Sequence, residues 1–226
     1  MSSSTNYYSC DHEVKNDCIR SRVKYNLGLH HLRNKEYEKA LILFKASDSS
    51  YSNYQLGFMY INGEGVSKDI AEGIRLFTLS ANCNFDIAQE KLGDIYFRGI
   101  IIEINYKIAF KWYEKSAHLG NKEAQNNVGS MYFNGTYVTQ NYITAALWYR
   151  KAEAQNQPDA IYNLGIIHLN GLDIEQNTSI AIKKFKHAAM LKNKDAQYEL
   201  SELYLKGIYI EKDYYEGMKW LHLYME

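Results

Sequence analysis

Apolar positions along the chain follow a helical spacing that starts again every 36 residues. Near the middle of the chain, Ala124, Val128, Met131 and Tyr132 fall at intervals of four, three and one residues, the period of one face of an α-helix. A second apolar stripe with charged neighbours, "LWYRKAEA", follows after a short loop. The pattern predicts two amphipathic helices in each unit, which we call helix A and helix B.

Two glycine positions, six residues apart, keep a fixed phase in these units. The first is held by Gly57, Gly93, Gly129, Gly165 and Ser201, and the second by Gly63, Gly99, Gly135, Gly171 and Gly207. The second position predicts the end of helix A, because glycine adopts the left-handed conformation of a helix C-terminus at no steric cost. The first position predicts a close contact between helices.

The loop after helix A also repeats. It is expected to bury one aliphatic residue in each unit, namely Val66, Ile102, Val138, Ile174 or Ile210. Three residues later comes Asp or Asn in every unit, at Asp69, Asn105, Asn141, Asn177 and Asp213. A side-chain oxygen there can accept hydrogen bonds from the free N–H groups of the next helix, so these residues are the predicted N-caps of helix B.

A two-helix unit with one apolar stripe on each helix cannot close its own core. Successive units must therefore stack, as in repeat proteins. The predicted fold class is all-α: a right-handed superhelical α-solenoid of α/α repeats, with about six helical hairpins.

The unit resembles the Sel-1-like repeat, a relative of the tetratricopeptide repeat. The motif is matched by "AQEKLGDIYFRG" with "AFKWYEKSA" and by "AQNNVGSMYFNG" with "ALWYRKA". Three departures stand out: a third glycine, Gly65, occurs in the first unit alone, Ser201 replaces the first glycine, and His168 replaces the motif tyrosine. Upstream, "YNLGLHHLRNKEYEKALILFKAS" resembles a tetratricopeptide hairpin.

These matches divide the chain into three regions. We expect a polar N-terminal tail at 1–17, a tetratricopeptide-like first hairpin at 18–50, and five Sel-1-like repeats in one continuous solenoid domain over 51–226. The repeats are expected at about 51–86, 87–122, 123–158, 159–194 and 195–226.

Composition and charge narrow the partner classes. Lys and Arg total 26 against 26 Asp and Glu, so no overall basic field attracts nucleic acid. No apolar run is long enough to predict membrane insertion, and the polar N-terminus does not resemble a secretory signal. We expect a cytoplasmic protein, delivered into a host cell if its source is an intracellular bacterium. Three cysteines, none in a C-x-x-C pair, predict no disulfide framework.

Candidate chemistry is sparse. The histidines at 30, 31, 118, 168, 187 and 222 fall in predicted helices at unrelated phases, and no nucleophile keeps a catalytic spacing to any of them. Cys10 and His12 are too few ligands for a closed metal site. We therefore predict no enzyme activity, no cofactor and no metal. Some cysteine-rich relatives in the family, with disulfides in every repeat, are described as hydrolases. A hydrolase-like enzyme is therefore an alternative, which the lack of such disulfides in this chain weakens.

By resemblance to tetratricopeptide grooves, helix A lines a concave face, with exposed positions at −3, +1, +4 and +5 from the first glycine. The candidate binding residues on this face are Tyr54, Phe58, Asn62, Asp94, Arg98, Asn126, Ser130, Asn134, Tyr162, Ile166, Asn170, Tyr198, Glu202 and Lys206. Two alternatives stay open: the asparagines at +5 serve as turn formers before the glycine, and the tyrosines at −3 cover the hairpin beneath.

The stretch "DYYEGMKWLHLYME" suggests a second interface. It is helix B of the last unit, with no polar capping helix after it. A homodimer or another partner is expected to dock on Trp220, Leu221, Leu223 and Tyr224. The sequence therefore predicts a non-enzymatic scaffold or adaptor that binds a partner protein or extended peptide on the concave face; the alternative is a self-assembling structural protein that uses this end.

Overall fold

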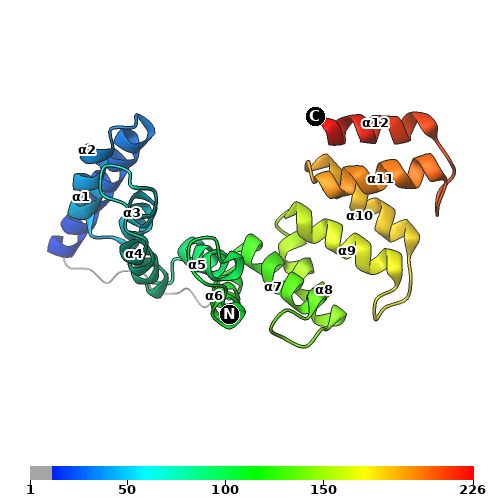
Figure 1. The fold of residues 1–226 in the computed structure, drawn as a ribbon, viewed down its shortest axis with the longest axis horizontal. Coiled ribbons are helices and arrows are strands. Elements are labelled where there is room, and N and C mark those ends of the chain that lie inside the picture. The colour runs from blue at the N-terminus through cyan, green and yellow to red at the C-terminus, as the bar shows by residue number, and fades with distance from the viewer. Residues whose placement is uncertain (1–11) are drawn as a thin grey trace. The chain divides into compact units, whose positions relative to one another are not determined.

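The computed structural model describes residues 12–226, and within them helices and loops account for the whole fold (Figure 1). The helices are α1 (His12–Arg33), α2 (Tyr37–Ser47), α3 (Ser50–Asn62), α4 (Ile70–Asn82), α5 (Asp86–Arg98), α6 (Tyr106–His118), α7 (Lys122–Asn134), α8 (Tyr142–Glu153), α9 (Pro158–Asn170), α10 (Thr178–Met190), α11 (Lys194–Lys206) and α12 (Tyr214–Met225). Odd-numbered helices are the predicted A helices, and even-numbered helices the B helices.

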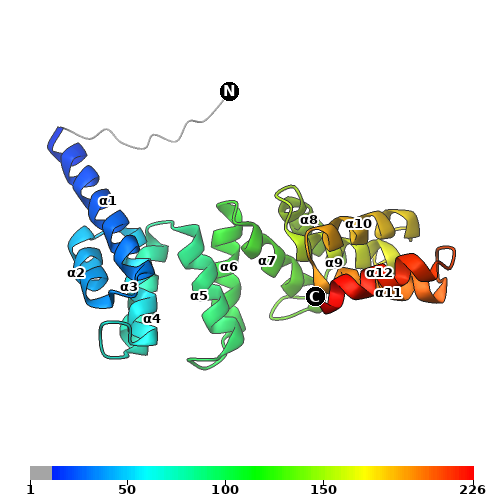
Figure 2. The same ribbon diagram turned by 90° about the horizontal axis from the view of Figure 1, so that it is seen from above.

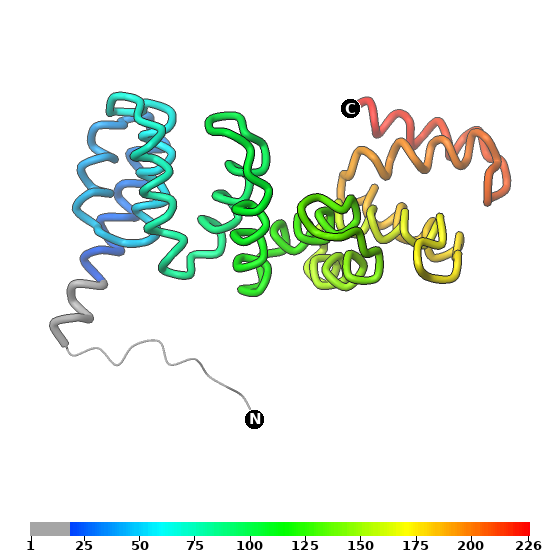
Figure 3. Tube along the Cα trace, turned by 60° about the horizontal axis from the view of Figure 1, so that its bottom comes forward, coloured from blue at the N-terminus to red at the C-terminus, as the bar shows by residue number. Residues whose placement is uncertain are grey.

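The helices form six paired hairpins in an all-α repeat solenoid, as the sequence predicts. Helix A and helix B run side by side in hairpins such as α7–α8 and α11–α12, and Figure 2 and Figure 3 show the second of these. Contacts group the chain into two compact units, one ending at Leu92 and one running from Gly93 to Glu226.

The cores show why no hairpin stands alone. In the second unit one buried cluster joins Phe110 and Tyr113 of α6 to Val128 and Met131 of α7, the next hairpin. Another joins α8 to α9 in the same way. In these pairs helix B therefore fills its core with the following helix A, as expected for stacked repeats. In the first unit the corresponding core contains Phe44 of α2 and Leu56 of α3.

The helix ends confirm the predicted signals. The side chains of Asp69, Asn105, Asn141, Asn177 and Asp213 each accept a hydrogen bond from the backbone N–H three residues on. The second glycine of each unit has a positive φ, for example +68° at Gly135, where its N–H donates to the Met131 carbonyl. The loop residues Val66, Ile102, Val138, Ile174 and Ile210 are half-buried, less than the sequence predicts.

In the first four repeats the first glycine faces a ring of helix B. A Cβ atom built on Gly129 would lie 2.7 Å from Cδ1 of Tyr149, and one on Gly165 would lie 2.5 Å from Cε1 of Phe185. Both rings are buried, so they have little room to move. The glycine pair of these four repeats is therefore part of the scaffold: one glycine leaves room for a ring and the other ends a helix.

The N-terminal region differs from its expected bounds. Residues 1–11 of the expected tail lie outside the described residues. They include Cys10, which was considered with His12 as a metal ligand. Helix α1 already begins at His12, so residues 12–17 belong to this helix. Its partner α2 packs Phe44 against Gly28, the glycine of the tetratricopeptide-like match.

Candidate functional site

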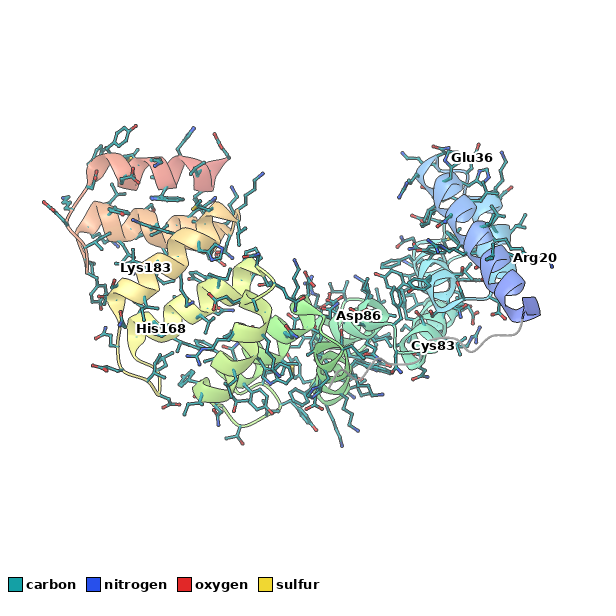
Figure 4. The ribbon with its side chains drawn as sticks, turned by 180° about the vertical axis from the view of Figure 1, so that it is seen from behind. Arg20, Glu36, Cys83, Asp86, His168 and Lys183 are labelled. Atoms are coloured by element: carbon teal, nitrogen blue, oxygen red, sulfur yellow. The ribbon has the colours of Figure 1, made fainter. Side chains whose placement is uncertain are left out.

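The predicted binding residues lie on the A helices, and we call the surface that they define the helix-A face (side chains in Figure 4). Positions −3, +1 and +5 are four residues apart, so they follow one side of each helix. The two compact units are described separately below, because each contributes its own part of the face.

In the first unit the helix-A face is an aromatic cluster. The rings of Tyr54 and Phe58 lie 5.0 Å apart, and Phe85, just before α5, lies 5.4 Å from Tyr54. Tyr51 extends the cluster to the surface, with its ring 4.8 Å from Phe85 and 52% of its area exposed. Such edge-to-face ring contacts hold large side chains in fixed orientations.

Polar groups border this cluster. The Lys91 ammonium lies 5.3 Å from the centre of the Phe58 ring, a cation–π contact. Asn62, the last residue of α3, is exposed and donates to Glu64 in the loop. The first unit therefore offers an aromatic centre with a cation and an amide beside it.

In the second unit, position +1 is partly occupied within each hairpin. The Tyr113 hydroxyl donates to Asp94 Oδ1 at 2.8 Å, and the Tyr149 hydroxyl donates to Ser130 Oγ at 3.2 Å. Burial raises the pKa of the Tyr149 phenol, so this hydroxyl remains a donor at neutral pH. Two of the predicted binding residues, Asp94 and Ser130, thus already accept a hydrogen bond from a tyrosine of helix B.

The same position is apolar where helix B carries phenylalanine. Phe58 lies 5.0 Å from the Phe77 ring, and Ile166 packs against the cluster that contains Phe185. The residue at +1 therefore matches the chemistry of the ring that faces it. The two partners of each pair are nineteen residues apart in the sequence. An interpretation that treats position +1 as part of an exposed groove overlooks this pairing.

Position −3 is more buried than the sequence predicts. Asn126 is buried, and its Oδ1 lies 3.4 Å from the Asn163 amide of α9. Tyr162 is half-buried against Phe185, at 5.5 Å between ring centres. Burial, with the carboxylates of Glu199 and Asp195 nearby, raises the pKa of Tyr162 to about 12.

Tyr198 is the exposed member of this row in α11, and its ring lies 5.4 Å from Tyr224. Next to it, burial and the neighbouring Glu202 raise the pKa of Glu199 above its usual range. The end of the helix-A face is therefore acidic and tyrosine-rich.

Position +5 is exposed in every unit. Arg98, Asn134, Asn170 and Lys206 are the last residues of their helices, each directly before the glycine C-cap. Lys206 forms an ion pair with Glu202 one turn earlier. The exposed amides of Asn134 and Asn170 suit recognition, and their place before the glycine also suits a turn.

The expected end interface needs a correction. Trp220 is only 8% exposed and belongs to the core cluster that includes Ala188 and Ala189 of α10, so its side chain is not available to a partner. Leu221 and Leu223 are half-buried, and Tyr224 is exposed. The outward apolar residues of α12 are instead Tyr214, Tyr215, Met218 and Met225.

His168 lies on α9, where Figure 4 labels it, and the structure gives its buried Nδ1 no hydrogen-bond partner. Burial, with Lys184 and Arg150 nearby, lowers the pKa of this imidazole. The neutral form is therefore favoured. Its charged neighbours are Arg150 and the Lys184–Glu153 ion pair.

Sequence reasoning missed two kinds of residue. Tyr51 and Phe85 complete the aromatic cluster; the signal was an aromatic residue three positions before Tyr54. The other kind is a buried glutamine four residues before the first glycine. Gln125 of α7 donates to the Ala117 carbonyl of α6, and this hydrogen bond joins two successive hairpins. Gln125 also accepts a hydrogen bond from Gln155. Its recurrence at Gln89 and Gln197 was the available signal.

Two features of the described residues bear on other classes of function. No group of three or more His, Cys, Asp or Glu side chains there is arranged to hold a metal ion. In the same part of the chain, every helix is too short or too polar to cross a bilayer.

Comparison with known proteins agrees with the geometry. The Sel1 repeat model matches residues 50–85, 86–121, 122–157, 158–193 and 194–223. A sel1-like repeat-containing protein, L21, of Acanthamoeba polyphaga mimivirus is 35% identical over 82 residues, which are 35% of this chain and 15% of that protein.

Two solved structures are also similar. A Sel1 repeat protein from Oxalobacter formigenes has a TM-score of 0.82 and 25% identity, covering 89% of this chain and 83% of that one. A protective antigen of uropathogenic Escherichia coli with an SLR fold has a TM-score of 0.79 and 28% identity, covering 91% of this chain and 45% of that one. This chain therefore spans less than half of the antigen and a small part of the viral protein.

Proposed function

We propose a protein-binding role for this chain, which belongs to the Sel1 repeat family: a non-enzymatic scaffold that holds a partner protein on its helix-A face. Sel1 repeats mediate protein interactions, and five of them make up most of the chain. The partner class is a protein or an extended peptide, and we place the protein in the cytoplasm, which cell fractionation would test.

The observation that carries the proposal is the aromatic cluster of the first unit. Tyr51, Tyr54 and Phe58 lie along one side of α3, and the Tyr51 ring reaches the surface. Tyrosine is enriched among the residues that dominate binding energy, because it combines a large apolar area with a hydroxyl. Ring contacts that already fix these side chains reduce the ordering entropy lost on binding.

The exposed ends of the A helices support the same role in the second unit. Asn134 and Asn170 each present an amide at the same place in successive repeats. Amides can donate to and accept from the backbone of an extended peptide. Asn134 and Asn170 are the last residues of α7 and α9, 36 residues apart in the sequence.

The test starts from affinity capture with the full chain as bait, followed by mass spectrometry. The captured partner is then titrated against two variants, Tyr51→Ala and the double variant Asn134→Ala/Asn170→Ala. Each removes exposed side chains, so both should fold. We expect at least one of them to weaken binding about tenfold, the loss of one interface anchor.

A matched control is Asn82→Ala, which changes an exposed asparagine at the end of a B helix, α4. It should leave the affinity unchanged. Full affinity in both test variants, or an equal loss in the control, would move the partner site away from the helix-A face.

A second candidate function is self-assembly through α12. Tyr214 and Tyr215 are 68% and 78% exposed, and Met218 and Met225 also face outward. Light scattering of the purified chain over a range of concentrations would show a dimer that Tyr215→Asp abolishes. A monomer at every concentration would exclude this candidate.

A further inference from the structure

The charges of the second unit are divided between its two rows of helices. Helices α6, α8 and α10 carry Lys107, Lys111, Lys115, Arg150, Lys151, Lys183, Lys184 and Lys186 against two glutamates, Glu114 and Glu153. Their A-helix neighbours α7, α9 and α11 carry five carboxylates and three lysines. A chain whose formal charge is zero overall thus has a strongly basic row of B helices.

Most of these cations have no carboxylate partner. Lys184 pairs with Glu153 at 2.6 Å. The other seven are exposed, and none of them forms an ion pair with any part of the chain that the structure describes. We call the surface that these seven residues define the basic face; they are Lys107, Lys111, Lys115, Arg150, Lys151, Lys183 and Lys186. Figure 4 labels Lys183, which lies on α10.

Equivalent cations elsewhere in the chain are neutralised. On α4, Arg75 pairs with Glu72 at 2.7 Å, and on α12, Lys219 pairs with Glu216 at 3.1 Å. Both glutamates precede their cation by three residues. At the same place before Lys111 and Lys183 the sequence has Ile108 and Ile180. The middle repeats therefore lack the glutamate that the first and last repeats use.

The basic face is continuous across the three helices. The His118 ring of α6 lies 5.3 Å from Trp148 of α8, and the Lys184–Glu153 ion pair joins α10 to α8. Lys107, Lys111 and Lys115 of α6 are four residues apart, and Lys183 and Lys186 of α10 are three apart, so each set shares one side of its helix. Arg150 and Lys151 of α8 are three and four residues after Leu147.

An aliphatic strip runs through the middle of this face. On α8 the outward positions that correspond to Lys107 and Lys111 of α6 are Ile143 and Leu147, 54% and 53% exposed. Lysine-bearing helices thus lie on both sides of two exposed aliphatic side chains. A complementary occupant needs carboxylates on both sides of aliphatic groups.

We propose that the basic face of α6, α8 and α10 binds an acidic protein segment with aliphatic residues between its carboxylates. This site is separate from the helix-A face and does not depend on what binds there. Complementary charge favours encounter with such a segment and selects against basic partners.

Two other polyanions fit the face less well. Single-stranded nucleic acid stacks its bases on open aromatic rings, but here Lys151 lies 3.9 Å above the Trp148 ring and Lys115 lies 4.3 Å above Trp112. A helix that lies in a lipid surface needs a broad apolar side, and on this face α6 presents lysines where α8 presents Ile143 and Leu147.

The experiment uses the full chain and a fluorescent peptide that repeats the triplet Glu-Glu-Leu four times, read by fluorescence anisotropy at low salt. We expect Lys111→Glu/Lys183→Glu to weaken binding about tenfold or more. The matched control, Arg75→Glu/Lys219→Glu, has the same change in net charge at cations that are already paired, and it should change the affinity less than about twofold. Circular dichroism verifies that both variants fold.

A third variant tests the role of the missing glutamate. Ile180→Glu gives Lys183 the neighbour that Lys219 has, so it should also weaken binding of the peptide. Equal losses in the two charge-reversal pairs would overturn the proposal, as would equal binding of a peptide with Gln in place of Glu. So would tighter, Lys111-dependent binding of oligothymidylate or of vesicles that contain phosphatidylserine.

Discussion

Hairpins α7–α8 and α11–α12 are equivalent parts of two repeats, yet helix A contacts helix B through different residues in each. In the first, Gly129 leaves space for the buried ring of Tyr149. In the second, Ser201 is buried at the glycine position, its hydroxyl donates to the Tyr198 carbonyl at 2.7 Å, and the residue that replaces the ring is Leu221. The glycine is therefore required by the ring of helix B and not by the geometry of helix A.

The surfaces of the two hairpins differ for the same reason. Ser130 in α7 accepts a hydrogen bond from Tyr149. Its counterpart Glu202 has no tyrosine to satisfy, because Leu221 stands in that place, and it pairs instead with Lys206 on the surface. A repeat position thus serves packing in one hairpin and surface charge in another, so a binding residue has to be identified from its contacts.

The largest expected effect on stability is at the tryptophan that each of the two hairpins has at the same repeat position. Trp220→Ala should lower the free energy of unfolding by about 3 to 5 kcal/mol, because it empties a core position. Trp148→Ala should cost less, since that ring is half-buried. Urea denaturation measures both. A small loss in the free energy of unfolding for Trp220→Ala would contradict the buried position of this side chain and favour the exposed position that the sequence predicts.

The next effect is at the glycine itself. Gly129→Leu should cost about 1 to 3 kcal/mol by overpacking against Tyr149. Ser201→Ala keeps a Cβ atom at the equivalent position and should cost less than about 1.5 kcal/mol, the contribution of one hydrogen bond. Similar costs in thermal or urea unfolding would remove the distinction between the hairpins.

Helix caps should have the same effect in both hairpins. Asn141→Ala and Asp213→Ala each remove an N-cap hydrogen bond to the N–H three residues on. Each should cost about 1 kcal/mol in unfolding experiments. A loss in one hairpin alone would show that the repeats differ in their helix ends as well as in their ring contacts.

The smallest effect concerns pH and the hairpin between these two. His168 of α9 stands where α7 and α11 have Tyr132 and Tyr204. Because its pKa is lowered in the folded chain, the unfolded chain binds more protons just below the ordinary histidine pKa of about 6.5. Stability should therefore fall as the pH drops through this value, and His168→Tyr should remove that loss. Parallel pH profiles of unfolding for the two proteins would contradict this.

Much of the fold follows from local sequence. The 36-residue recurrence predicts the paired helices, the Asp and Asn caps, and the left-handed glycines, because each depends on residues within one or two turns. Gly65 shows where local reasoning stops: a Cβ atom there would lie 2.7 Å from the backbone of Tyr37, which belongs to the preceding hairpin.

The candidate site was less predictable for the same physical reason. Spacing places Asn126 and Trp220 on a side of their own helices, but the neighbouring hairpin decides whether that side is covered. Asn163 of α9 donates a hydrogen bond to Asn126, and Trp220 belongs to the buried cluster that contains the alanines of α10. The residues at +5 are exposed because the chain turns away directly after them.

The most direct test of the packing that positions these surfaces is a double-mutant cycle on one hairpin. Gly129→Ser and Tyr149→Leu together give α7–α8 the residues that α11–α12 has at these positions. Urea unfolding of the native chain, both single variants and the double variant yields the coupling free energy. We predict that Gly129→Ser is costly beside tyrosine and much less so beside leucine, with a coupling of about 1 kcal/mol or more. Costs that add within about 0.5 kcal/mol would contradict the dependence of the glycine on the ring.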